Sequence, residues 1–220
     1  MVAHFPRAVL FDMDGTLTDT EVLWDVALEA MAKELNGTLS AELRDELVGR
    51  NEEFATARML HELGHPNADV RQWQDWIADR MKALLKQGVE WLPGAQELLH
   101  SVVASGCRTA LVTATRRELT EILLDQLGRD NFGTVVTGDE VANKKPHPQP
   151  YLQALETLQV SPHEAIVVED SWSGISSGLA AGCVVVTVPS TAQLPPAPEG
   201  KLHQFTALTE VNIGHLQSLV

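Results

Sequence analysis

Short apolar runs alternate with helical patterns along most of this chain. The runs are residues 8–11, 109–112, 165–168 and 184–186, with a weaker one at residues 134–136. Short apolar runs bounded by turn-forming residues are typical of strands buried on both faces of a parallel sheet. Between them, apolar side chains recur at helical spacing, as at Leu119, Ile122, Leu123 and Leu127. The alternation predicts an α/β fold, with a Rossmann-like parallel sheet that carries helices on both faces.

One region departs from this alternation. Residues 21–87 contain no strand signal, and residues 17–20 and 88–94 connect them to the rest of the chain. The spacing of apolar residues there predicts helices over residues 21–35, 41–48, 52–63 and 68–87. We therefore expect an all-helical cap domain inserted after the first strand. The expected domains are a Rossmann-like core of residues 1–17 and 91–220, and a cap of residues 18–90.

Composition narrows the class of partner. Hydrophobic residues make up 44% of the 220 residues, enough for a substantial buried core. The formal net charge of −14 disfavours binding to nucleic acid and to anionic membranes, because like charges repel. We find neither an apolar stretch that would span a bilayer nor a signal segment in residues 1–7, and two cysteines cannot form a disulfide framework. We expect a cytoplasmic monomer that binds a small molecule.

Carboxylates follow two of the predicted strands. Asp12 and Asp14 come directly after the first strand, and Glu169 and Asp170 follow residues 165–168. Ligands of parallel sheets lie at the carboxyl ends of the strands, so we expect these side chains to converge. Clustered buried carboxylates repel one another unless a cation lies between them, and Mg²⁺ prefers carboxylate and carbonyl oxygens. The sequence therefore predicts a Mg²⁺ site at this edge.

Two further positions supply groups that a phosphate would need. Thr113 ends the strand at residues 109–112 and offers a hydroxyl and backbone N–H groups near a helix N-terminus. Lys145 lies in a loop fixed by Pro146 and Pro148, where it can hold an anionic group as a point charge. Taken alone, Lys145 is more typical of a solvated loop, and the acids after the first strand are equally typical of an ordinary turn.

Together, in this order, these segments resemble the haloacid dehalogenase-like hydrolase superfamily, in the subgroup with a helical cap after the first strand. The matching segments are residues 12–16 (DMDGT), Thr113, residues 145–148 (KPHP) and residues 169–174 (EDSWSG). Each segment alone is common, whereas the ordered set at the right strand ends is specific. The resemblance extends to about residue 189 and assigns no role to the tail.

The resemblance implies phosphoryl transfer through an aspartyl-phosphate. Asp12 is then the nucleophile, and Asp14 protonates the leaving oxygen before it takes a proton from the attacking water. Mg²⁺ is expected on Asp12, Asp170 and the carbonyl of Asp14, with Glu169 as an outer partner or alternative ligand. The groups expected to offset the phosphate charge are Lys145, Thr113 and the backbone N–H groups of Asp14 and Ala114.

We therefore expect a Mg²⁺-dependent phosphatase of a small phosphorylated metabolite, such as a sugar phosphate or a phosphoglycolate-like compound. The alternative enzyme is a sugar phosphomutase of the β-phosphoglucomutase type, which uses the same core and holds a second phosphate with a cap arginine. Arg50 lies in the corresponding stretch, but the aligned position holds Glu52. The alternative of another class is an inactive regulator that binds a phosphorylated ligand. Asp14 argues against dehalogenation, which does not use a second acid there.

The cap offers two candidates for the substrate pocket and one misleading motif. Trp24, one turn into the first cap helix, is a candidate against ordinary core packing, and Arg50 is the other. Residues 61–65 (HELGH) match the pattern of a zinc-protease helix. Gly64 and Pro66 interrupt the helix that would bring both histidines to one face. We interpret this segment as a helix end.

Overall fold

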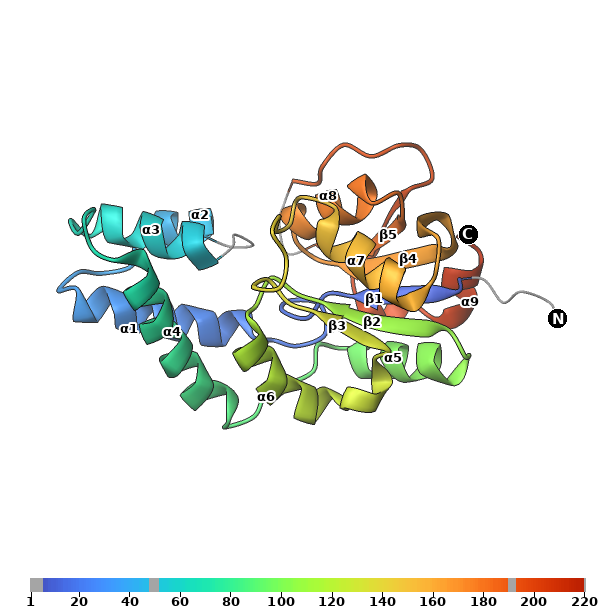
Figure 1. Cartoon of the computed structure of the whole chain (residues 1–220), viewed down its shortest axis with the longest axis horizontal. Coiled ribbons are helices and arrows are strands. Elements are labelled where there is room, and N and C mark those ends of the chain that lie inside the picture. The colour runs from blue at the N-terminus through green and yellow to red at the C-terminus, as the bar shows by residue number, and fades with distance from the viewer. Residues whose placement is uncertain (1–5, 48–51, 190–192, 220) are drawn as a thin grey trace.

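A computed structural model describes residues 6–47, 52–189 and 193–219 of the chain. Figure 1 shows a part built around a sheet and, beside it, a part built from helices. The strands are β1 (Ala8–Phe11), β2 (Arg108–Val112), β3 (Thr134–Val136), β4 (Ala165–Glu169), β5 (Val184–Thr187) and β6 (Leu202–Gln204). The helices are α1 (Glu21–Glu34), α2 (Ala41–Leu47), α3 (Glu52–Glu62), α4 (Val70–Leu85), α5 (Ala95–Ala104), α6 (Arg117–Leu127), α7 (Gln149–Leu158), α8 (Trp172–Ala180) and α9 (Ile213–Gln217).

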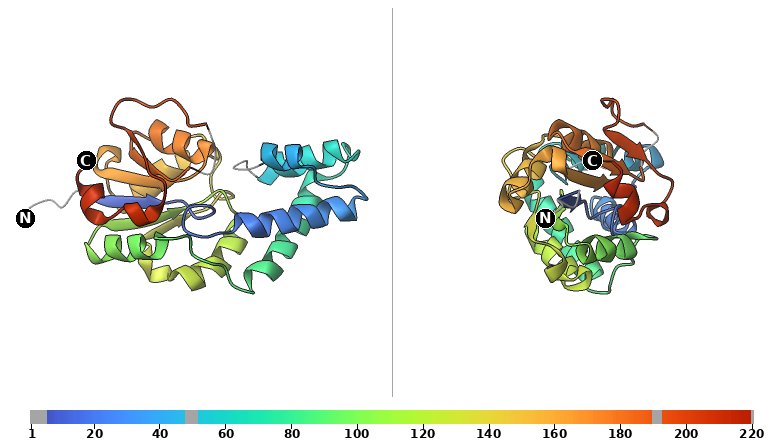
Figure 2. Two further views of the ribbon diagram at one scale, coloured as in Figure 1. Left: turned by 180° about the vertical axis from the view of Figure 1, so that it is seen from behind. Right: turned by 90° about the vertical axis from the view of Figure 1, so that its right-hand side faces the viewer.

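The sheet is parallel throughout, and β1 lies at its centre. Its strand order is β3-β2-β1-β4-β5-β6, so that β1 pairs with both β2 and β4. Helices α5, α6 and α9 cover one face and α7 and α8 the other, as the two opposite views in Figures 1 and 2 show. Within β1, Val9 and Phe11 pack on the first face and Leu10 on the second. The predicted α/β fold with helices on both faces is confirmed.

The predicted strands match β1 to β5 to within one residue at each end. The sixth strand was not expected. It lies in the tail, for which the sequence indicates only an extended proline-rich segment and a short final element. Leu202 to Gln204 pair with β5 alone at the edge of the sheet, and their side chains are at least partly exposed. Because such an edge strand needs no apolar run, its sequence carries no strand signal.

Helices α1 to α4 form the inserted helical part at the carboxyl ends of the strands (Figure 1). Their bounds lie within two residues of the predicted ones. Helices α1 and α3 both pack on α4, around a buried core that includes Met31, Met59, Ile77 and Met81. Helix α4 also packs on α6 of the sheet part. Among the described residues, no helix is long and apolar enough to cross a bilayer.

The two segments that join the helical part to the sheet run side by side. The N–H of Asp19 donates to Glu90 O at 3.0 Å, and the N–H of Leu92 donates to Leu17 O at 3.0 Å. Thr18 and Trp91 form an antiparallel bridge between these hydrogen bonds. The chain therefore leaves and re-enters the sheet part at one place, next to the end of β1.

The HELGH segment ends a helix, as its sequence indicates. Helix α3 stops at Glu62, and Gly64 adopts a positive φ of 83°, which residues with a side chain rarely adopt. His61 therefore lies on the helix and His65 beyond its end. The two histidines do not share one helical face, so the zinc-protease pattern is not reproduced.

We predict that Leu10→Ala lowers the free energy of unfolding by about 2–5 kcal/mol, because Leu10 is fully buried in the central strand and its loss leaves a cavity. Urea denaturation followed by circular dichroism at 222 nm measures this change. Leu152→Ala is the matched control, since Leu152 on α7 is 41% exposed and its truncation shifts stability by only about 0.5 kcal/mol. Equal losses in both variants would contradict the described core.

Candidate active site

A buried lysine joins the carboxylates that follow two neighbouring strands. Lys145 Nζ lies 2.6 Å from Asp12 Oδ1 and 2.6 Å from Glu169 Oε1, and it donates to Val112 O at 2.8 Å. The side chains of Lys145, Asp12 and Glu169 are only 4%, 9% and 0% exposed. Burial by itself would lower the pKa of Lys145, but the charges and hydrogen bonds of Asp12 and Glu169 outweigh burial and raise it. Lys145 therefore stays charged and holds Asp12 in one orientation.

Both oxygens of Glu169 are already engaged by protein donors. Besides Lys145, the hydroxyl of Tyr151 donates to Oε1 at 2.7 Å. Oε2 accepts from the N–H of Asp170 at 3.1 Å and from the N–H and hydroxyl of Ser171 at 3.3 and 3.2 Å. A Cβ at Gly174 would lie 1.7 Å from Oε1, so only glycine leaves room for this carboxylate. Glu169 is thus a rigid anchor for the lysine.

Excess negative charge gathers at this edge of the sheet. Oxygens of Asp12, Glu169 and Asp170 lie within 4.8 Å of one another, the one such cluster of acidic, His or Cys ligands in the part of the chain that the structure describes. Burial, then the charge of Glu169, raises the pKa of Asp12 well above its usual range against the opposing charge of Lys145. A Cβ at Gly15, where φ is +76°, would lie 2.5 Å from Asp170 Oδ2. The three carboxylates carry more negative charge than Lys145 alone neutralises. The cluster therefore fits a divalent cation that prefers oxygen ligands.

Asp14 lies where the sheet part meets the helical part. Thr20 Oγ1, just before α1, donates to Asp14 Oδ1 at 2.6 Å. Thr113 and Thr115, in the loop after β2, donate to Oδ2 at 3.1 and 2.8 Å. The N–H of Thr115 in turn donates to the hydroxyl of Thr113 at 3.0 Å. The three hydroxyls fix the direction of the Asp14 carboxylate, and the hydroxyl expected to bind phosphate, that of Thr113, is engaged with Asp14 here.

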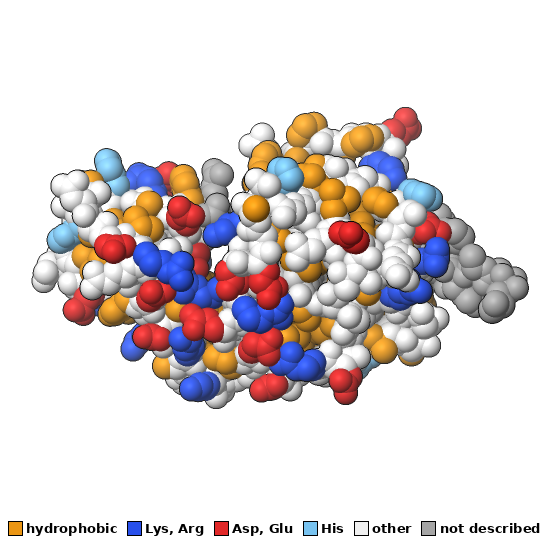
Figure 3. All heavy atoms as spheres, in the orientation of Figure 1, with side chains coloured by type: hydrophobic (Ala, Val, Ile, Leu, Met, Phe, Trp, Pro, Cys, Tyr) orange, Lys and Arg blue, Asp and Glu red, His pale blue; other side chains and the backbone are white. Residues whose placement is uncertain are grey.

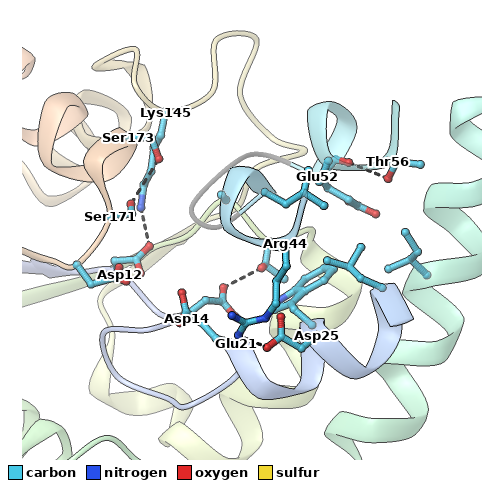
Figure 4. A pocket seen from close by; sticks show the side chains of 18 residues that line it. Asp12, Asp14, Glu21, Asp25, Arg44, Glu52, Thr56, Lys145, Ser171 and Ser173 are labelled. Atoms are coloured by element: carbon cyan, nitrogen blue, oxygen red, sulfur yellow. Dashed lines mark hydrogen bonds and ion pairs between the residues drawn. The ribbon is translucent and has the colours of Figure 1, made fainter. Parts of the chain in front are cut away.

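A cavity of about 160 Å³ separates these groups from the cap helices (Figure 4). The sequence-predicted residues that line it are Asp12, Asp14, Trp24, Ala114, Lys145 and Asp170. Glu169 and Thr113 lie behind this first layer, each hydrogen-bonded to a lining residue. Arg50 lies outside the described residues. The folded chain thus brings residues from four separated segments to one cavity, with Trp24 on its cap wall.

The sequence did not single out several side chains that organise the site. Thr20 and Thr115 orient Asp14, and Tyr151 supports Glu169. Threonines are common in loops, so the hydroxyls at residues 20 and 115 carry no signal of their own. Tyr151 is the chain's one tyrosine and falls on the buried face of α7, a position equally typical of core packing.

An ion pair between cap and core involves Glu52, which lines the cavity. Arg116 Nη2 lies 2.8 Å from Glu52 Oε1, and Arg116 Nε lies 3.1 Å from Oε2. Both side chains are largely buried, and Arg116 also reaches Asp75 on α4 at 3.0 Å. Figure 3 shows side chains of both charges over the face where α4 meets α6. The position at which related mutases are expected to hold an arginine is therefore a carboxylate tied to the core.

Comparison with known proteins agrees with this geometry. A family model described as haloacid dehalogenase-like hydrolase matches residues 9–188. The chain belongs to the haloacid dehalogenase-like hydrolases. The resemblance inferred from the four segments is thereby confirmed, and the matched range includes both the sheet part up to β5 and the helical insert.

Several known proteins are similar to this chain over most of their length. The chain is 32% identical to a phosphorylated carbohydrates phosphatase of Thermotoga maritima, covering 80% of this chain and 82% of that protein. It is 34% identical to a phosphoglycolate phosphatase of Nitrosospira multiformis, covering 84% and 86%. A crystal structure of CbbY from Rhodobacter sphaeroides in complex with xylulose-1,5-bisphosphate superposes with a TM-score of 0.80 at 27% identity, covering 93% and 95%.

We predict that Lys145→Met lowers the free energy of unfolding by about 3–5 kcal/mol without added metal, because it leaves Asp12 and Glu169 as buried carboxylates without their cation. Urea denaturation in the presence of EDTA measures the loss. Lys144→Met, one residue away and in no ion pair among the described residues, is the control and should change stability by less than about 1 kcal/mol. Similar stabilities of the two variants would argue against the ion pairs described above.

Proposed function

We propose that this chain is a Mg²⁺-dependent phosphatase that hydrolyses a phosphate monoester of a small metabolite through an aspartyl-phosphate on Asp12. The observation that carries the proposal is the buried carboxylate of Asp12, held by Lys145 at 2.6 Å and facing the cavity. Family membership supports phosphate ester hydrolysis, and the relatives named for carbohydrate phosphates and for phosphoglycolate support small phosphorylated substrates.

Attack on phosphorus requires a carboxylate that is ionised, oriented and shielded from the phosphate charge. Lys145 binds Asp12 Oδ1, which leaves Oδ2 as the attacking oxygen. The lysine ammonium also offsets repulsion between the carboxylate and the phosphate dianion. We propose that the backbone N–H of Ala114 and the hydroxyl of Thr113 complete the phosphate site, the latter after it leaves Asp14.

The acidic cluster fits Mg²⁺, and its residues would have different roles toward the ion. Asp12, Asp170 and the carbonyl of Asp14 would hold the ion, whereas Glu169 is occupied by Lys145, Tyr151 and Ser171 and would serve as an outer partner. When bound, Mg²⁺ supplies positive charge that lowers the repulsion between nucleophile and phosphate.

Asp14 is positioned to move the proton. Its carboxylate lines the cavity beside Asp12 and is directed by the hydroxyls of Thr20, Thr113 and Thr115. Asp14 would protonate the leaving oxygen when the aspartyl-phosphate forms, and would then accept a proton from the water that attacks phosphorus. The product is inorganic phosphate, and Asp12 is regenerated.

The proposal includes the domain division at residues 1–17 with 91–220 and 18–90, since residues 17–19 and 90–92 pair at that boundary. A monomeric state and a cytoplasmic location remain predictions from composition. The phosphomutase alternative has less support, because Glu52 is a carboxylate paired with Arg116. An inactive regulator is disfavoured because each chemical group that hydrolysis needs lies at the cavity.

We predict that Asp12→Asn reduces Mg²⁺-dependent phosphate release by about a thousandfold or more, because an amide cannot form the covalent intermediate. Release of inorganic phosphate from p-nitrophenyl phosphate and a panel of sugar phosphates measures it, with product isomers scored alongside. Asp125→Asn, whose side chain is 82% exposed on α6, is the control and should retain activity. Turnover of Asp12→Asn close to that of the unaltered chain would exclude the covalent route, and an isomerised sugar phosphate as the main product would favour the mutase.

We predict that Asp14→Asn slows hydrolysis about 10²–10⁴-fold for alkyl phosphates and much less for p-nitrophenyl phosphate, because only the poor leaving group needs the proton. The kcat of the variant across esters of increasing leaving-group pKa tests this. An equal loss for every ester would argue that Asp14 has no role as an acid.

A further inference from the structure

Arg116 joins helices α3, α4 and α6 at the boundary between cap and core. It immediately precedes α6, and its guanidinium donates to Glu52 of α3 through Nε and Nη2 at 3.1 and 2.8 Å. Its Nη1 donates to Asp75 of α4 at 3.0 Å. The side chains of Arg116 and Glu52 are only 12% and 15% exposed. This bidentate and largely buried contact therefore ties two cap helices to the core.

Another ion pair joins the same two parts of the molecule but is more exposed to solvent. Lys82 of α4 lies 2.8 Å from Glu118 of α6, and their side chains are 32% and 44% exposed. Exposed ion pairs contribute little because water and salt screen them. Glu52, by contrast, is buried enough that burial raises the pKa of its carboxyl against the opposing charge of Arg116. The place of the cap on the core therefore depends more on Arg116 than on Lys82.

Asp14 is held from both sides of this boundary. Thr115, the residue before Arg116, donates to Asp14 Oδ2 at 2.8 Å. Thr20, just before α1 of the cap, donates to Asp14 Oδ1 at 2.6 Å. Both hydroxyls can bind Asp14 at the same time only while the cap keeps its place relative to the loop after β2. The direction of the Asp14 carboxylate thus depends on contacts between cap and core that Asp14 does not itself make.

We infer that Arg116 is a positioning residue, which holds the cap on the core through Glu52 and Asp75 and thereby fixes the direction of the Asp14 carboxylate. The inference rests on the proposed phosphatase function. Arg116 does not line the cavity, so it acts on the substrate through other groups. Asp12, by contrast, is oriented by Lys145 from within the core. Loss of Arg116 should therefore weaken proton transfer by Asp14 more than attack by Asp12.

Two aryl esters of similar size separate these two steps. Phenol is a poorer leaving group than p-nitrophenol, so hydrolysis of phenyl phosphate depends more on a proton from Asp14. In the purified full chain with Mg²⁺, Arg116→Gln should lower kcat for phenyl phosphate about tenfold and kcat for p-nitrophenyl phosphate by less than about threefold. Arg116→Lys keeps the charge and should recover part of the loss. Lys82→Gln removes the exposed ion pair and is the control, with both kcat values within about twofold of the unaltered chain.

A double-mutant cycle tests whether Arg116 acts through Glu52. If it does, the variant with both Arg116→Gln and Glu52→Gln should lose no more kcat for phenyl phosphate than the larger of the two single losses. Losses that multiply would indicate independent roles and would overturn the inference. If Arg116→Gln does not fold, as judged by circular dichroism, Glu52→Gln and Arg116→Lys should show the same difference between the two esters.

The remaining outcomes separate this inference from the proposed function. Equal losses of kcat for both esters in the Arg116 variants would overturn the inference and leave the phosphatase function standing. A loss of the same size and pattern in Lys82→Gln would also overturn it. No Mg²⁺-dependent phosphate release from either ester by the unaltered chain would overturn the phosphatase function and, with it, this inference.

Discussion

The ion pairs of Lys145 with Asp12 and Glu169 constrain the whole catalytic end of this protein. Asp12 and Lys145 are 133 positions apart in the chain, yet their charged atoms lie 2.6 Å apart and away from water. Charges buried in this way are strongly destabilising unless all partners arrive together. The parallel register ensures this for the acids, because Phe11 pairs with Val168 and the next residues are Asp12 and Glu169. The register of β1 and β4, the loop that carries Lys145 and the orientation of Asp12 therefore depend on one another.

This arrangement also explains why the site divides into layers. Tyr151 and Ser171 satisfy Glu169, Glu169 and Val112 satisfy Lys145, and Lys145 directs Asp12. Of these residues, only Asp12 faces the reacting phosphorus in the proposed mechanism. A small displacement of Tyr151 or Ser171 would therefore shift Asp12, since the direction of each group is set by the one behind it.

The two ends of the cavity carry different charged groups. At the core end, Lys145 and a bound Mg²⁺ would concentrate positive charge for the phosphate. At the cap end, Glu21, Asp25 and Arg44 line the cavity, and Arg44 forms an ion pair with Asp25. Asp14 lies between them, held by hydroxyls from the start of the cap and from the loop after β2. The position of Asp14 thus depends on both parts of the molecule, which suits the two proton transfers proposed for it.

The sequence by itself determined the central strands, the helical insert and the acids at the strand ends. Buried parallel strands need uninterrupted apolar runs, and residues 8–11 or 165–168 have no stable alternative to being covered on both faces. Only the tertiary structure decided that Leu202–Gln204 join the sheet, that Thr20 and Thr115 orient Asp14, and that Glu52 pairs with Arg116. These choices rest on contacts between segments distant in the chain, made by ordinary polar residues whose partners no local pattern specifies.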